Sequence, residues 1–255
     1  MSSTTKHIKS KSNLAIGALT LALGLGELNQ TATAQENQNM TASTSASISD
    51  TLNARQQAIV PVAAFAAVGD IAGLNAALNR GLDAGLTISD AREILVQLYA
   101  YAGFPRSLNA LSELMKVVEA RKAKGIKDEP GSEPSHPAPK GDALLAVGTA
   151  NQTKLSGSPV EGPLFDFAPV ANEYLRTHLF GDIFERDNLD WQSRELATVS
   201  MLAALPGAEP QLQAHMRISM NTGLSAAQLR QLTEVLAEHV SDEMAGRARQ
   251  ALERQ

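Results

Sequence analysis

Hydrophobic positions in the last third of the chain recur every three to four residues, a period that predicts consecutive helices. The first predicted helix, 195–205, is apolar nearly all round and ends at Pro206-Gly207, because proline cannot continue a helix. A second helix carries His215 at the edge of its apolar face and stops at Gly223. Ser225 then begins a third helix in a Ser-x-x-Gln capping box.

The same pattern occurs earlier in the chain, at a shift of 138 residues. Residues 85–90 fall on residues 223–228, so a glycine stop, a leucine and a capping box coincide at one shift. The further matches are Gly69 on Gly207, Leu74 on Leu212, Arg92 on Arg230 and Leu98 on Leu236. Because this period is longer than that of any solenoid, the repeat predicts a duplicated helical domain.

Glu195 and His215 occur only in the second copy, because the equivalent positions of the first copy hold Gln57 and Ala77. A carboxylate one helix away from an imidazole is a pattern typical of acid–base chemistry. This pair is the strongest chemical signal in the sequence.

The first copy should contain four helices, ending with 106–122. The predicted helices are 52–68, 71–80, 88–101 and 106–122, with a break at Gly69-Asp70 and a bend at Gly103-Phe104-Pro105. For the last of them we expect Leu108, Leu111, Leu114, Met115 and Val118 to face the core. No stretch of useful length alternates apolar and polar residues as a strand does, so the predicted fold is all-α.

Residues 125–163 are rich in proline, glycine and serine, a composition that disfavours both helix and strand. We therefore expect a linker there, between a first unit at 52–124 and a second at 164–255. A helix over 169–183 should lead into the second unit.

The N-terminus has the pattern of a secretory signal peptide over residues 1–34. Three lysines precede an apolar run from Leu14 to Leu25, which is short for a membrane span of about 20 residues, and Ala32-Thr33-Ala34 offers a cleavage site. A retained anchor is the alternative. Residues 35–51 are polar and should form a disordered lead. We thus expect a periplasmic or secreted protein with no stable membrane anchor after cleavage.

Two segments resemble the carboxymuconolactone decarboxylase family. Residues 180–186, followed by the Arg194–Gly223 run, resemble its core motif, and Tyr99–Pro105 resembles its last-helix signature. The resemblance covers most of 52–118 and 165–251, so it implies two family units in tandem. The family is all-helical and includes lactone decarboxylases and thiol-dependent hydroperoxidases.

The hydroperoxidases of that family use a glutamate, a Cys-x-x-Cys pair and a histidine four residues after the second cysteine. Glu195 and His215 match the glutamate and the histidine of this motif, whereas Ala208 and Gln211 stand at the two cysteine positions. The chain contains no cysteine at all, so a resident thiolate cannot attack a peroxide. Similarity to these hydroperoxidases therefore does not imply that this chain uses their thiol-dependent mechanism.

The candidate catalytic residues are thus Glu195, His215 and His178; His178 lies on the predicted helix 169–183 and could face the same pocket. Arg194 and Arg217 could supply donors to a substrate oxyanion, and Tyr101 is a further substrate-contact candidate. In a purely structural interpretation, Glu195 is an ion-pair partner of a nearby arginine and His215 is a half-buried packing residue. The two histidines and Glu195 could also hold a metal, but their spacing does not require one, and we expect neither metal nor cofactor.

The sequence therefore predicts an exported lactone-type decarboxylase, isomerase or hydrolase, with carboxy-lyase-like chemistry implied by the resemblance. The alternative is a small-molecule binding or structural protein with a vestigial site. A net charge of −5 gives no general attraction for nucleic acid, so the expected partner is a small-molecule substrate. Family likeness also suggests a homo-oligomer, with a trimer as the assembly that it implies.

Overall fold

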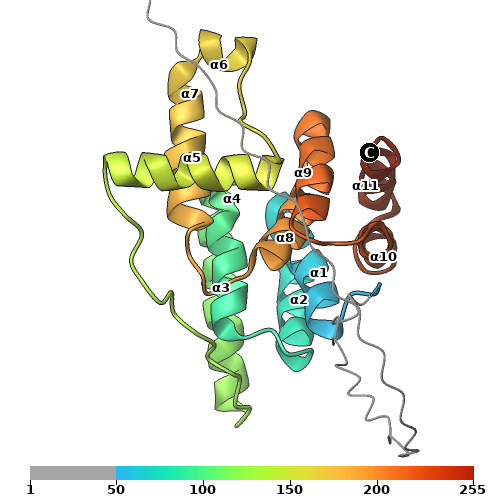
Figure 1. Ribbon diagram of the computed structural model, residues 1–255. Helices are drawn as coiled ribbons and strands as arrows, with labels where there is room; N and C mark the ends of the chain where they lie inside the picture. Colours follow the sequence, from blue (N-terminus) through green and yellow to red (C-terminus); the bar gives the residue numbers. More distant parts are fainter. Residues whose placement is uncertain (1–49) are drawn as a thin grey trace, which may run out of the picture. The chain divides into compact units, whose positions relative to one another are not determined.

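The computed structural model describes residues 50–255, and every regular element in this range is helical (Figure 1). The elements are α1 (Ala54–Val68), α2 (Ile71–Asp83), α3 (Ile88–Gln97), α4 (Tyr99–Ala123), α5 (Asp142–Ser156), α6 (Pro163–Phe167), α7 (Pro169–Tyr174), the π-helix η1 (Leu175–Ile183), α8 (Trp191–Ala203), α9 (Glu209–Asn221), α10 (Ala226–His239) and α11 (Asp242–Glu253). The predicted all-α fold is confirmed. The predicted signal peptide and most of the lead lie outside the described residues.

The internal repeat is visible in the helix boundaries. Helix α2 spans 71–83 and α9 spans 209–221, which is the same segment shifted by 138 residues. Both predicted capping boxes form, with Thr87 as the N-cap of α3 and Ser225 as the N-cap of α10. Each cap side chain accepts a hydrogen bond from the third helical residue, so these helix starts are fixed by local sequence.

Helices α1 and α8 occupy equivalent places in the two copies and pack against each other (Figure 1). Arg55 of α1 donates a hydrogen bond of 3.2 Å to Ser193 of α8, and these two positions are themselves repeat equivalents. Contact between equivalent positions is what an approximate twofold relation between the units produces. The buried apolar side chains of both copies form one continuous cluster, so the units share a core.

Glycine turns set the direction of the chain where helices end. Gly69 closes α1 in the left-handed conformation, with φ of 73°. Gly103 interrupts α4 with φ of 81° just before Pro105, so the predicted bend lies inside what is otherwise one long helix. Tyr101 lies directly before that bend, and its ring packs against both apolar clusters of the protein.

The structure corrects the prediction that residues 125–163 lack helix. Helix α5 covers Asp142–Ser156, because this part of the segment contains no proline and is rich in alanine and leucine. The prolines lie on either side of it. The Pro and Gly content of the whole segment therefore hid a helix of 15 residues.

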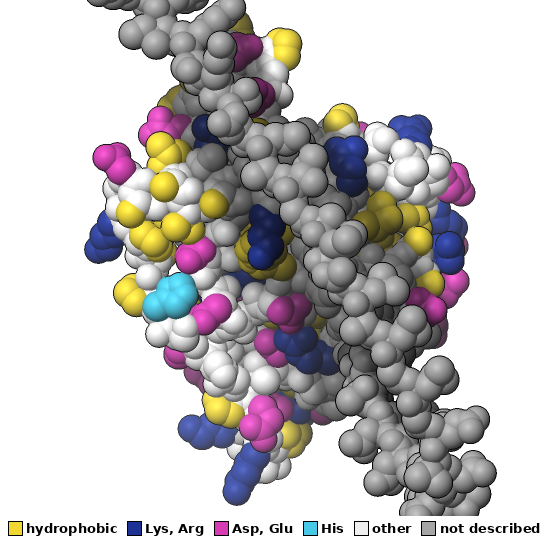
Figure 2. All heavy atoms as spheres, in the orientation of Figure 1, with side chains coloured by type: hydrophobic (Ala, Val, Ile, Leu, Met, Phe, Trp, Pro, Cys, Tyr) yellow, Lys and Arg dark blue, Asp and Glu magenta, His cyan; other side chains and the backbone are white. Residues whose placement is uncertain are grey.

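Helix α5 packs closely on the π-helix η1. A Cβ atom at Gly148 of α5 would overlap the carbonyl oxygen of Arg176, and one at Gly181 of η1 would lie 2.7 Å from Leu144. Two glycines thus allow the helices to approach backbone to backbone. Beneath them lies a second apolar cluster, formed by Leu155, Leu179, Phe180, Ile183, Phe184 and Ile218. On the face shown in Figure 2, hydrophobic side chains gather over α5.

The prediction of which α4 side chains face the core is partly wrong. Leu108 and Met115 are 60% and 57% exposed, whereas Ala110, Leu114 and Val117 are buried. The apolar stripe of α4 is wider than the surface that the neighbouring helices cover, so its outer edge stays in solvent. Within residues 50–255, no helix is both long and apolar enough to cross a membrane.

Candidate active site

Glu195 and His215 meet inside the protein, as the sequence predicts. The Nδ1 atom of His215, on α9, lies 2.8 Å from Oε2 of Glu195, on α8. Glu195 is fully buried, and His215 is 8% exposed. The second carboxylate oxygen, Oε1, is buried and has no hydrogen-bond partner within the described range. With Nδ1 engaged by the carboxylate, Nε2 is the ring nitrogen left for a ligand.

The first unit supplies the support behind this pair. The ring of Tyr101 packs edge-on against the His215 imidazole, with ring centres 5.8 Å apart. Its hydroxyl lies 3.3 Å from Oγ1 of Thr198, which accepts a hydrogen bond of 2.7 Å from Gln97. Burial first, and then the nearby Glu195 carboxylate, raise the pKa of Tyr101 far above its ordinary value. Tyr101 therefore stays protonated, and its hydroxyl oxygen accepts the hydrogen bond that Thr198 donates.

The structure does not bring Arg194 to a substrate. Its side chain is fully buried and pairs with Glu93 of α3 at 3.1 Å, while Gln97 and the Arg186 carbonyl accept further hydrogen bonds. Burial lowers the pKa of Arg194. Burial would raise the pKa of Glu93, but hydrogen bonds from Arg186 and the charge of Arg194 lower it to about 2. Arg194 thus joins the two units beneath the site, and the expected oxyanion contact is corrected.

His215 and Arg217 line one cavity of about 600 Å³. Gln211, on the same helix α9, lines it as well. Its other walls come from α5, α6, α7 and η1. The apolar part of the lining is Pro159, Val160, Leu164, Phe165, Ala171, Leu175, Leu179, Phe180, Ala214 and Ile218. A largely apolar cavity with a few polar groups is the usual form of a small-molecule site.

Gln152 of α5 is a polar residue of this cavity that the sequence prediction missed. Its side chain is 3% exposed and lines the same cavity as His215. A carboxamide can both donate and accept hydrogen bonds, so Gln152 is suited to orient a bound molecule in this cavity. No sequence pattern singles it out, because its helix lies in the segment that the sequence predicts to be a linker.

His178 does not join the pair. Its side chain is 61% exposed and lies 2.6 Å from Asp182 on the same π-helix, and it is absent from the lining of the His215 cavity. Its ring also meets Tyr99 edge-on. Tyr101, although it supports His215, does not line the cavity either. Among residues 50–255, no three His, Asp or Glu side chains gather closely enough to hold a metal ion.

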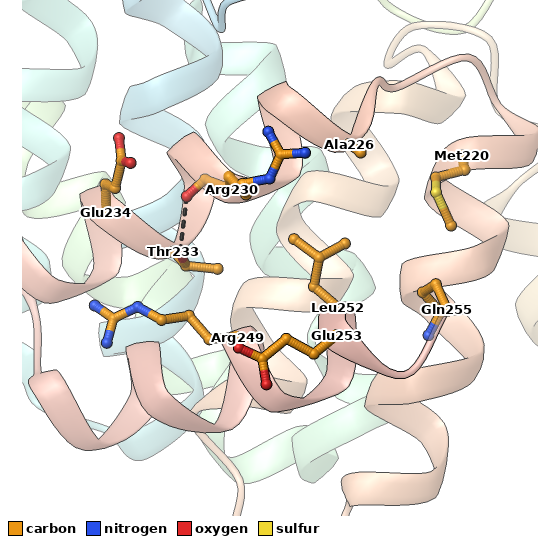
Figure 3. A pocket seen from close by; sticks show the side chains of 9 residues that line it. All are labelled: Met220, Ala226, Arg230, Thr233, Glu234, Arg249, Leu252, Glu253 and Gln255. Atoms are coloured by element: carbon orange, nitrogen blue, oxygen red, sulfur yellow. Dashed lines mark hydrogen bonds between the residues drawn. The ribbon is translucent and has the colours of Figure 1, made fainter.

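A second cavity, of about 450 Å³, lies between α9, α10 and α11 (Figure 3). Figure 3 labels all of its lining residues, and a hydrogen bond joins Thr233 to the Arg230 carbonyl. Its four charged side chains are Arg230, Glu234, Arg249 and Glu253, and all are exposed. Their charges balance and stay solvated, so this cavity offers no activated group comparable to the buried pair.

Comparison with protein families agrees with this architecture. The model of the carboxymuconolactone decarboxylase family matches residues 34–115 and again residues 169–254. The chain belongs to the carboxymuconolactone decarboxylase family. The two matches give a tandem member, with one match for each copy of the repeat. No curated protein matches the chain.

Family membership makes the positions on α9 informative. Gln211, which stands where the family's hydroperoxidases have their second cysteine, lines the same cavity as His215. Ala208, at the first cysteine position, is the residue before α9. The tandem decarboxylase-family chain thus keeps the carboxylate and imidazole of the motif and presents an amide in place of the thiol.

Proposed function

We propose that this chain is an enzyme that uses Glu195 and His215 for acid–base chemistry on a small lactone-type carboxylic acid. The observation that carries the proposal is the 2.8 Å contact between these side chains at the wall of the cavity. Decarboxylation is the favoured reaction, because the chain belongs to a decarboxylase family. Isomerisation and hydrolysis of a lactone would use the same pair.

In this proposal His215 exchanges a proton with the substrate through Nε2. The Glu195 carboxylate holds Nδ1, so it fixes the orientation of the ring and stabilises the imidazolium that forms when Nε2 takes up a proton. Tyr101 packs against one edge of the ring and limits its rotation. A positioned imidazole of this kind typically contributes a rate factor of about 10² to 10⁴.

For a carboxylated unsaturated lactone, the carbon–carbon bond to the carboxylate breaks and releases carbon dioxide. The electron pair enters an extended enolate, and the proton on Nε2 of His215 goes to its carbon terminus; water then restores that proton. The enolate oxygen needs donors, and Arg217 and Gln152 are the polar donors of the cavity lining suited to this role. Arg194 is not one of them.

The alternative is a binding protein that holds a small molecule without converting it. It is favoured by the first unit, which keeps its fold with Gln57 and Ala77 in place of the pair. A vestigial second site would bind ligand in the cavity but would show no turnover that depends on His215.

We also propose that the protein is exported to the periplasm or secreted, on the strength of the N-terminal signal pattern. A homo-oligomer, a trimer by family likeness, is part of the same proposal. Its support is the exposed apolar edge of α4, where Phe104, Leu108 and Met115 are each more than half exposed.

The test is incubation of the purified protein with a panel of carboxylated lactones and alkyl hydroperoxides, with and without a dithiol. We expect loss of carbon dioxide or a shifted double bond for one lactone, and no dithiol-dependent peroxide consumption. Robust peroxide turnover would contradict the acid–base proposal. Saturable binding of lactones without any product would favour the binding protein.

A further inference from the structure

The His215 cavity is larger than a compact lactone acid needs. Its volume is about 600 Å³, whereas an acid of about ten non-hydrogen atoms displaces about ten water molecules, or roughly 300 Å³ of liquid. About half of the cavity therefore stays free beside such a molecule. The side chains that line this free half decide what can fill it.

The side of the cavity away from α9 is an apolar recess. It is formed by Val160, Leu164, Phe165, Leu175, Leu179 and Phe180. Leu179 and Phe180 belong to the second apolar cluster and are 6% and 5% exposed, so they make a well-packed floor. Figure 1 shows α6 and α7 apart from α9, with the loop after α5 between them. The recess and His215 thus lie towards opposite ends of one cavity.

Leu164 is the wall of the recess that a ligand would cover. It lies on α6, a helix with no buried residue, and it is 68% exposed although it lines the cavity. An apolar group in the recess would remove this surface from water, which is favourable. The charged lining residues, Glu161 and Arg217, are exposed and opposite in sign, so they offer no net charge to select an ion. Apolar contact is therefore the main source of affinity in the recess.

Part of the recess is specific to this chain within its family. Helix α5, the loop after it and α6 cover residues 142–167, which lie between the two segments that match the family model. This stretch supplies Val160, Leu164 and Phe165 of the recess. A wall added beside the acid–base pair can change which molecule fits without changing the chemistry of the pair.

We propose that the recess binds an alkyl chain of roughly six to ten carbon atoms, since about 300 Å³ holds about ten atoms at the volume of one water each. The chain belongs to the molecule whose reactive end lies at His215, so the ligand class is an alkyl-substituted lactone. That this molecule is a substrate rests on the proposed function, whereas the binding of an alkyl chain does not.

The test is calorimetric titration of the purified protein with γ-lactones that differ only in the alkyl substituent: γ-valerolactone with methyl, γ-octalactone with butyl and γ-decalactone with hexyl. Each added CH₂ group should lower Kd about two- to fourfold, so the hexyl lactone should bind at least about thirtyfold more tightly than the methyl lactone.

Two variants on α6 separate the recess from general surface adsorption. Leu164→Gln should weaken binding of γ-decalactone at least about fivefold. Phe167→Gln is the matched control, because Phe167 is an apolar residue of the same helix that is 88% exposed and does not line the cavity. It should leave the affinity within about twofold of wild type. Both residues are exposed, so both variants should keep the wild-type melting temperature.

Affinity that does not rise with chain length would overturn the recess, as would absence of γ-decalactone binding or equal losses in the two variants. Chain-dependent binding that needs Leu164, without turnover of any lactone, would remove the proposed function and leave the recess. Turnover that depends on His215, without any preference for an alkyl chain, would remove the recess and leave the proposed function.

Discussion

Replacement of Glu93 by glutamine tests the buried charge network that joins the two units beneath the site. Glu93 accepts hydrogen bonds from Arg186 at 2.6 and 2.9 Å and from Arg194 at 3.1 Å. Glutamine preserves the shape of the side chain and removes its charge. Arg186 is 34% exposed in its side chain and can be solvated, whereas the fully buried Arg194 cannot.

The expected loss of stability can be worked out from the pKa and from the burial. The pKa of Glu93 falls from 4.5 to about 2, and a shift of this size corresponds to on the order of 3 kcal/mol of folding free energy. Removal of one partner from a buried ion pair costs about 3–5 kcal/mol. Both routes predict a free energy of unfolding lowered by about 3 kcal/mol.

The same network gives the pH dependence a definite sign. Because the folded-state pKa of Glu93 lies below the unfolded-state value, its contribution is fully present above about pH 5. It is lost as the pH falls from there towards 2, where the carboxylate takes up a proton in the folded protein too. When the pH is lowered from about 5 towards 2, the free energy of unfolding should therefore fall less in the Glu93→Gln variant than in the wild type.

Urea unfolding, followed by the fluorescence of Trp191, measures both effects. Trp191 is the single tryptophan of the chain, and its indole donates a hydrogen bond to the Phe184 carbonyl, so its emission should report unfolding. Glu243→Gln is the control, because Glu243 is 79% exposed in its pair with Arg247 and should cost less than about 1 kcal/mol. A Glu93→Gln variant within 1 kcal/mol of wild type at neutral pH would refute the reasoning.

Two further predictions concern the elements around the cavity. Gly148→Ala should destabilise the protein, because the added Cβ overlaps the Arg176 carbonyl, whereas Gly246→Ala in α11, with open space around it, should stabilise by about 0.5–1 kcal/mol. Thermal unfolding measures both, and an equal gain at the two glycines would contradict the close α5–η1 contact. His178→Ala should leave kcat/KM for the substrate within about threefold of wild type, since His178 is exposed and outside the cavity; a loss of a hundredfold would return it to the site.

Much of the fold was predictable because local signals and the repeat agree. Capping boxes and glycine stops fix helix ends through contacts within a few residues, and a shift of 138 residues carries one set of boundaries onto the other. The boundaries of α5 were hidden, because average composition over 125–163 conceals a proline-free stretch. The exposure of Leu108 depends on which helices cover α4, and no local pattern reports that.

The candidate site was predictable only in part. Glu195 and His215 stood out because charged or titratable side chains beside apolar stripes are uncommon, and the structure places them in contact. Arg194 gave the same signal but pairs with Glu93, about a hundred residues away in sequence, which periodicity does not encode. Gln152 lies in the segment that the sequence predicts to be a linker, and only the packing of its helix brings it to the cavity wall. Its place in the site therefore cannot be predicted from a local sequence pattern.

The most direct test of the central claim compares kcat/KM and melting temperature for His215→Ala and Glu195→Gln on the lactone that is turned over. Each change should lower kcat/KM by at least about a hundredfold, the contribution expected of a positioned acid–base group, while the melting temperature shows a folded protein. Gln57→Ala, at the position equivalent to Glu195 in the first copy, should retain wild-type turnover. Full activity of His215→Ala would contradict the account and place the chemistry elsewhere in the chain.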